Sequence, residues 1–201
     1  MSGGFVICEY DSVKQGFPQY QRTMQSLKAA IIEKATRDWS PKTYGRMSPT
    51  SAQFGTSTIM PELFRSMSTG TASSATLTTW NQWLDTTGSQ TIMSGSNSGV
   101  IYEDYKIGLA GLAFLDKSIN IAEIRMQISD RKTGRINIEE AFAYEQPAVI
   151  FEDGFILDEE TGFDLYAYVL STGYQKIKLL GIEANRVPNK LQVSNTGAAL
   201  T

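Results

Sequence analysis

The 201-residue chain contains no histidine. This absence removes the commonest general base, the commonest zinc ligand and every serine or cysteine triad that depends on imidazole. Cys8 is the single cysteine, and one thiol can form neither an intrachain disulfide nor a thiolate metal cluster. Because Cys8 follows an apolar run at residues 5–7, we expect it to be a buried small hydrophobic residue. We therefore expect a protein without enzymatic activity.

An excess of positive charge and a long apolar run are also lacking. The formal net charge is −3 and the sequence pI is near 5.1. These values disfavour a dedicated nucleic-acid-binding protein, because such a protein gains affinity when a positively charged surface releases counterions from the phosphates. No stretch approaches the roughly 20 apolar residues of a membrane helix, and the first residues lack the features of a signal peptide. We expect a soluble protein made in the cytoplasm, with no membrane span and with nucleic-acid contact unsupported by its charge.

The apolar content, 41% of the residues, is enough for one sizeable core. Between Gln19 and Trp39, apolar residues recur at spacings of three and four, which predicts an amphipathic helix that ends where Ser40 precedes Pro41. Its opposite side carries a mixture of basic and acidic residues and is interpreted as a solvated face. The apolar stripe consists of Tyr20, Met24, Leu27, Ile31, Ala35 and Trp39.

Charge almost disappears between residues 48 and 98, where only Glu62, Arg65 and Asp85 are ionised. Serine, threonine and glycine dominate this region, a composition typical of flexible linkers. However, it also contains many large apolar residues, and a free linker would not. We therefore expect a long Ser/Thr-rich excursion that becomes ordered by packing on the rest of the chain or on a neighbouring subunit.

Short helical turns are predicted within this region at Pro61 to Met67 and at Thr76 to Leu84, followed by a polar loop from Gly88 to Gly99. Its tryptophans admit two interpretations, because exposed indoles can stack on sugars whereas buried ones anchor a core or an interface. We favour anchors. The candidate interface residues are Leu63, Phe64, Leu77, Trp80, Trp83 and Leu84.

Strand patterns dominate the second half of the chain. Lys106 to Leu115 is a nearly continuous apolar run containing Gly108 and Gly111. This suits a strand buried on both faces, with close backbone approach or a bulge at glycine. Further on, the apolar phase slips at Ala122 and Glu123, which predicts a β-bulge there.

Turn residues divide the remaining sequence into further strands. Tyr166 and Tyr168 share one phase, opposite to that of the neighbouring apolar residues, so we expect the outward set to contact a partner. In chain order, the expected elements are a turn at Asp130 to Gly134, a strand at Arg135 to Glu145, a turn at Asp153-Gly154, and a hairpin of Gly162 to Ser171 with Tyr174 to Val187.

Carboxylates are densest between residues 152 and 164, over two adjacent turns. Calcium prefers oxygen-rich loops, but the spacing of an EF-hand is absent and the turns alone account for Asp and Gly. We expect no metal and no cofactor; Asp153, Asp158 and Glu160 are the candidates for a cation site. An enzyme would have to work through carboxylates and tyrosines alone, with Asp158 and Glu159 as its first candidates.

The end of the chain resembles the terminal strands of jelly-roll subunits in virus particles. The resemblance rests on Gly162 to Leu170, which reads Gly-Phe-Asp-Leu-Tyr-Ala-Tyr-Val-Leu, and on Tyr174 to Ile182, which reads Tyr-Gln-Lys-Ile-Lys-Leu-Leu-Gly-Ile. It implies an eight-stranded sandwich of two antiparallel sheets, an arm that reaches neighbours, no enzymatic activity, and function by self-assembly. The helix that precedes the sheets departs from that pattern, and a capsid arm that touches a genome would be more basic.

We therefore predict a mostly β protein, an antiparallel jelly-roll-like sandwich with one N-terminal amphipathic helix and a long Ser/Thr-rich excursion. The predicted function is that of a structural subunit of a virion or similar shell, with copies of itself and other virion proteins as partners. The alternative is a carbohydrate-binding or receptor-binding β-sandwich module. The expected organisation is an N-terminal strand and helix at 1–47, an arm at 48–99, an antiparallel core at 100–188 and a tail at 189–201, together forming one domain.

Overall fold

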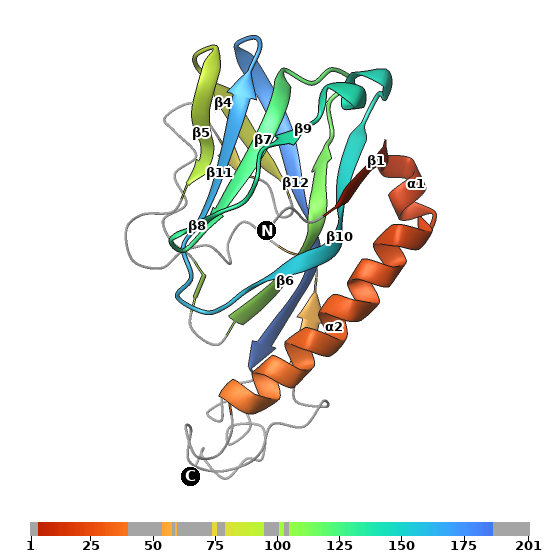
Figure 1. Ribbon diagram of the computed structural model, residues 1–201, viewed down its shortest axis with the longest axis vertical. Helices are drawn as coiled ribbons and strands as arrows, with labels where there is room; N and C mark the ends of the chain where they lie inside the picture. The colour runs from red at the N-terminus through yellow and green to blue at the C-terminus, as the bar shows by residue number, and fades with distance from the viewer. Residues whose placement is uncertain are drawn as a thin grey trace, which may run out of the picture.

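The described part of the protein consists mainly of two antiparallel β-sheets and one long N-terminal helix (Figure 1), as the sequence patterns predicted. The structure is a computed structural model, and it describes residues 4–39, 54–57, 59, 74–75, 79–94, 101–102 and 105–186. No helix within these ranges is long and apolar enough to cross a membrane. Within these ranges, the helical elements are α1 (Tyr10–Lys14), α2 (Pro18–Asp38) and the 3-10 helix η3 (Glu139–Ala143).

The larger sheet has seven strands in the order β1-β10-β6-β12-β4-β3, with β2 beside β12. Its strands are β1 (Phe5–Glu9), β2 (Phe54–Ser57), β3 (Ser74–Ala75), β4 (Trp80–Leu84), β6 (Tyr105–Phe114), β10 (Pro147–Leu157) and β12 (Gly173–Arg186). The smaller sheet has five strands in the order β5-β11-β7-β8, with β9 beside β7. Its strands are β5 (Gly88–Ser94), β7 (Ile121–Ile128), β8 (Arg131–Lys132), β9 (Ile136–Asn137) and β11 (Phe163–Val169). The inner faces of both sheets contribute to one apolar core.

The central strand β6 is buried on both faces, which confirms the prediction from its continuous apolar run. Neighbouring backbones approach it closely, since a Cβ atom at Gly111 would overlap the carbonyl oxygen of Val149. The pairing register with both neighbouring strands skips Ala110, so a bulge lies next to Gly111, as expected. The bulge predicted in β7 is also confirmed, because its pairing with β11 skips Ala122.

Helix α2 packs on the outer face of the larger sheet, over β10, β6 and β12 (Figure 1). Its buried residues Leu27, Ile31 and Ala35 belong to the predicted stripe, and its bounds differ from the prediction by one residue at each end. The Thr23 hydroxyl donates a hydrogen bond of 2.8 Å to the carbonyl oxygen of Phe151 in β10. Cys8 is buried beneath this helical layer, as expected, and burial raises the pKa of its thiol.

The hairpin predicted at the end of the chain is wrong. Strands β11 and β12 are consecutive in the sequence, but β11 pairs with β5 and β7 whereas β12 pairs with β2, β4 and β6. The chain therefore crosses from one sheet to the other after Val169. At this crossing, the backbone N–H of Leu170 donates a hydrogen bond of 2.8 Å to the carbonyl oxygen of Asn120. Alternating apolar residues show which side of a strand faces the core, but they do not show which strand lies beside it.

Two predictions between residues 130 and 157 are also corrected. The expected strand at Arg135 to Glu145 is limited to the two residues of β9, and η3 follows it. Asp153-Gly154 is not a turn between strands but an irregularity inside β10, where the pairing register with β6 shifts. Gly154 has a φ of 67°, and a Cβ atom there would lie 2.8 Å from Cδ1 of Leu27. The absence of a side chain at Gly154 therefore leaves room for Leu27 of α2.

The predicted arm at residues 48–99 includes strands of both sheets. Trp80 to Leu84 is the strand β4 rather than a helical turn, since it pairs with β3 and β12, and its side chains alternate in burial. Gly88 to Ser94 is the strand β5 rather than a polar loop. The helical turn predicted at Pro61 to Met67 and the tail at 189–201 lie outside the described residues.

Candidate functional site

The three described interface candidates occupy different environments. Trp80 is 1% exposed and Leu84 is 0% exposed, and both side chains pack in the core of their own chain. They have no surface to offer to a partner, which corrects the expectation that they lie at an interface. Trp83, on the opposite side of the same strand, is 36% exposed. The remaining candidates Leu63, Phe64 and Leu77 lie outside the described residues.

Trp83 forms an aromatic pair with Tyr174 on the outer face of the larger sheet. The two residues are register partners in β4 and β12, and their ring centroids are 4.8 Å apart with the planes tilted by 58°. Tyr174 is 52% exposed. Lys176 and Lys178 follow on the same side of β12, where Lys178 Nζ lies 5.9 Å from the ring centroid of Tyr10. This pair joins residues from distant parts of the sequence, so periodicity alone could not reveal it.

A second cluster joins the C-terminal end of α2 to the sheet. Lys106, in β6, is 1% exposed, and its Nζ lies 2.9 Å from Oδ2 of Asp38 and 3.1 Å from Oδ1 of Asp158. Lys34 Nζ lies 3.2 Å from the other carboxylate oxygen of Asp158. Nε1 of Trp39 donates a hydrogen bond of 3.3 Å to Oε1 of Glu159. The buried lysine is therefore neutralised by carboxylates from the helix and from the loop after β10.

These contacts shift two pKa values. Burial alone would raise the pKa of Asp38, but the hydrogen bond and charge of Lys106, with help from Arg37 and Lys34, hold that pKa below its ordinary value. Burial alone would lower the pKa of Lys106, but the carboxylates of Asp38 and Asp158 raise it above its ordinary value. Both groups are therefore charged at neutral pH, and the cluster acts as a structural link between helix and sheet.

The candidate cation ligands do not come together. Asp158 is engaged with two lysines, Asp153 lies in the irregular part of β10, and Glu160 lies in the following loop. Within the described ranges, no group of three or more acidic or cysteine side chains is arranged to hold a metal ion. Asp158 and Glu159, the residues considered for hydrolysis, form the ion cluster with Lys106 instead.

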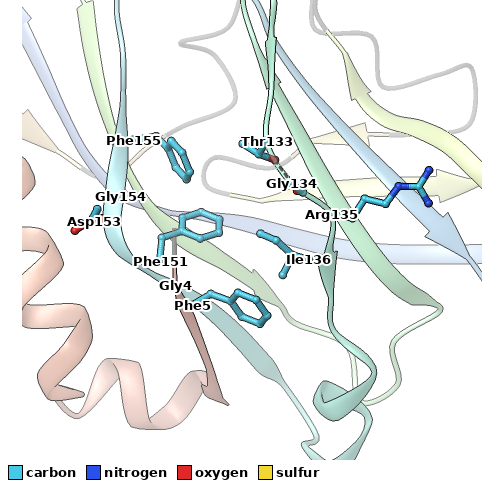
Figure 2. A pocket seen from close by; sticks show the side chains of 10 residues that line it. All are labelled: Gly4, Phe5, Thr133, Gly134, Arg135, Ile136, Phe151, Asp153, Gly154 and Phe155. Atoms are coloured by element: carbon cyan, nitrogen blue, oxygen red, sulfur yellow. Dashed lines mark hydrogen bonds between the residues drawn. The ribbon is translucent and has the colours of Figure 1, made fainter. Parts of the chain in front are cut away.

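An apolar cleft lies between the edges of the two sheets (Figure 2). Its volume is about 180 Å³, and it is lined by β1 and β10 on one side and by residues 133–136 on the other. Phe5, Phe151 and Phe155 point into the same space, and the rings of Phe151 and Phe155 meet edge to face at 5.1 Å. The side chain of Arg135 points away from the cleft. This lining suits apolar packing, since it brings together no pair of groups for acid–base chemistry among the residues described there.

The chain matches no protein-family model, no curated protein and no solved structure. Function therefore has to follow from the strand pairing and from the chemistry of the surfaces.

Proposed function

We propose that the chain is a jelly-roll structural subunit of a virus particle or of a comparable self-assembling shell. The observation that carries this proposal is the nesting of four antiparallel pairs between β4 and β12, in which the first of these strands pairs with the last and each further pair lies inside the previous one in the sequence. These pairs are β4 with β12, β5 with β11, β6 with β10, and β7 with β9.

Nested pairing of this kind is what results when one long hairpin is rolled into two facing sheets. The pairs β4 with β12 and β6 with β10 lie in the larger sheet, and the pairs β5 with β11 and β7 with β9 lie in the smaller sheet. The same alternation accounts for the crossing between β11 and β12 that replaces the expected hairpin. Double-sheet jelly rolls with eight strands recur in viral capsid and lectin domains, so the topology supports the family resemblance of the final strands.

A fold does not by itself determine a function, so the surface has to support the proposal as well. Trp83 and Tyr174 form an exposed aromatic pair on the outer face of the larger sheet. The pair lies outside the apolar layer that α1 and α2 form on that face with Cys8, Ala113 and Ile150. Aromatic side chains of this kind are enriched among the residues that dominate binding energy at protein interfaces. In the proposed mechanism, copies of the chain bury this pair against one another in a symmetric array.

The alternative, a carbohydrate-binding module that stacks sugars on Trp80 and Trp83, is less well supported. Trp80 is buried in the core, and the ring of Trp83 is tilted by 58° against Tyr174. These rings do not form a flat shared platform. Glycan binding that disappears in Trp83→Ala, with the fold intact, would favour this alternative over the subunit function.

Light scattering of the purified protein, combined with negative-stain imaging, tests the proposed function. We expect assemblies whose amount increases with protein concentration. The double variant Trp83→Ala, Tyr174→Ala should weaken association roughly thirtyfold, the effect of losing about 2 kcal/mol at an interface centre. Phe142→Ala is the matched control, because Phe142 is a similarly exposed aromatic residue, at 46%, in η3. A monomer at micromolar concentration, or equal weakening by the control, would contradict the proposal.

A further inference from the structure

A polar depression lies on the outer face of the smaller sheet. This sheet is on the other side of the sandwich from α2 (Figure 1). Its volume is about 120 Å³. Strands β5, β7, β8 and β11 contribute to it, together with the segment before β9. The polar side chains that line it are those of Ser89, Glu123, Arg125, Lys132, Arg135 and Tyr166.

Strand register explains why these residues meet. In β11, Tyr166 lies opposite Arg125 of β7, and Tyr168 lies opposite both Glu123 of β7 and Ser89 of β5. All of them belong to the phase that points away from the core, whereas the intervening residues of β11 are buried. Tyr166 and Tyr168 therefore form the outward set of β11, and charged neighbours accompany them.

The depression has a local excess of positive charge in a chain whose net charge is −3. Its lining contains three cationic side chains and one carboxylate. Nε of Arg125 donates to the carbonyl oxygen of Thr133 at 3.1 Å, which fixes the guanidinium group. Lys132 Nζ lies 5.3 Å from the ring centroid of Tyr166, and Nη1 of Arg135 lies 3.5 Å from Oε1 of Glu123. Among the residues described, no carboxylate forms an ion pair with Arg125 or Lys132.

We propose that this depression binds an acidic saccharide through its carboxylate or sulfate group. The guanidinium group of Arg125 and the ammonium group of Lys132 supply charge-assisted donors for that anion. The carboxylate of Glu123 and the hydroxyl of Ser89 accept hydrogen bonds from sugar hydroxyl groups. The half-exposed ring of Tyr168 lies beside them and offers an apolar surface for one face of the sugar ring.

A nucleic acid fits the same surface less well. A phosphate backbone would gain from the three cations, but its charge repeats at every nucleotide and would bring a phosphate against the carboxylate of Glu123, where a saccharide can place a hydroxyl group. The volume of about 120 Å³ accommodates one anionic group with part of a ring, rather than a run of stacked nucleotides. Sulfated and sialylated saccharides present the same anionic chemistry, so experiment has to separate them.

Calorimetric titration at low salt tests this proposal with three probes: a heparin-derived tetrasaccharide, 3′-sialyllactose and neutral lactose. We expect saturable binding of at least one acidic probe and no measurable binding of lactose. The tighter of the two acidic probes identifies the anion as sulfate or carboxylate. The measurement does not depend on assembly, so it can succeed or fail whether or not the proposed shell function is correct.

Charge variants show whether the depression is the binding site. Lys132→Ala should weaken binding about tenfold, the loss expected for one charge-assisted contact. Arg131→Ala is the matched control, because it removes the neighbouring exposed cation of β8, whose partner Ile128 belongs to the opposite phase. Both residues are exposed surface side chains, and circular dichroism melting of each variant verifies that the fold is retained.

A second variant separates saccharides from nucleic acid without removing a cation. Glu123→Gln should weaken binding of the acidic saccharide several-fold, because the strong acceptor for sugar hydroxyls is lost. A site for a phosphate backbone would instead bind a single-stranded oligonucleotide more tightly after this change. The proposal is overturned if neither acidic probe binds, if lactose binds equally well, if Arg131→Ala is as damaging as Lys132→Ala, or if the oligonucleotide outcompetes both saccharides.

Discussion

The outer faces of the two sheets differ, although both sheets have the same alternating backbone. Strand β6 of the larger sheet is buried on both sides, because α2 covers it from outside. Strand β7 of the smaller sheet alternates buried residues such as Ile124 and Met126 with the partly exposed Glu123 and Arg125. The outward positions of a strand therefore reveal whether another layer covers them.

The covered face is crowded as well as apolar. Small residues lie where the helical layer and neighbouring strands approach, including Ala113, Ala148 and Gly154. The open face of the smaller sheet instead carries long polar side chains that surround the proposed saccharide site. Sequence changes should therefore be costly on the first face and should affect stability little on the second.

The largest effect is expected from adding a single methyl group inside the crowded sheet. Gly111→Ala should lower the free energy of unfolding by more than about 3 kcal/mol, because its Cβ would overlap the backbone of β10. Gly134→Ala is the matched control beside the smaller sheet, since nothing lies within 4 Å of the added atom. Urea unfolding of both variants measures the difference. Equal stability of the two variants would refute the contrast between the faces.

A smaller loss is expected when the link between α2 and the larger sheet is cut. Lys106→Ala should lower the free energy of unfolding by about 2 to 3 kcal/mol, because Asp38 and Asp158 lose the cation that lies between them. Lys28→Ala, on the exposed side of α2, should change it by less than about 0.5 kcal/mol. Urea unfolding monitored by circular dichroism compares them. A loss no greater than that of the control would show that the cluster does not hold the helix.

The smallest expected effect is the change with pH in the stability that the ion cluster around Lys106 contributes. The pKa of Asp38 is lower in the folded chain than its ordinary value of 3.8, so its stabilising contribution is present above pH 3.8 and is lost as the pH falls through the folded pKa. The pKa of Lys106 is raised above 10.5, so its contribution is complete below pH 10.5 and is lost as the pH rises through the folded pKa.

Asp38→Asn separates this contribution from that of the other carboxylates. Between pH 5 and pH 3, the variant should lose less free energy of unfolding than the unchanged protein, because its position no longer titrates. Denaturant unfolding at a series of pH values measures how the free energy of unfolding of each protein changes with pH. An equal change in the variant and in the unchanged protein would contradict the assigned role of Asp38.

Local features were predictable because they depend on neighbouring residues. The stripe at Leu27, Ile31 and Ala35 identified α2, since helical geometry places these spacings on one face. The slip of phase at Ala122 identified the bulge in β7. The misassigned strand β4 also shows period-two alternation in the structure, but Trp80 and Leu84 are four apart and fit a helical spacing as well.

Features that depend on distant residues were not predictable in this way. The expected hairpin of β11 with β12 failed because proximity in the sequence does not decide which sheet a strand joins. Trp83 was identified as an interface candidate, but its partner Tyr174 was not. The charged depression around Lys132 was missed for the same reason, since its residues come from separate strands.

The sequence by itself determined the mostly antiparallel character of the protein, the position of its amphipathic helix and the central strand buried on both sides. These follow from periodicities of 3.6 and 2, which the backbone imposes within a few residues. Only the tertiary structure decided the nested strand order, the ion cluster beneath α2 and the different chemistry of the two outer faces. These features depend on which distant strands pair around the core, and the same local periodicity is compatible with many different pairings.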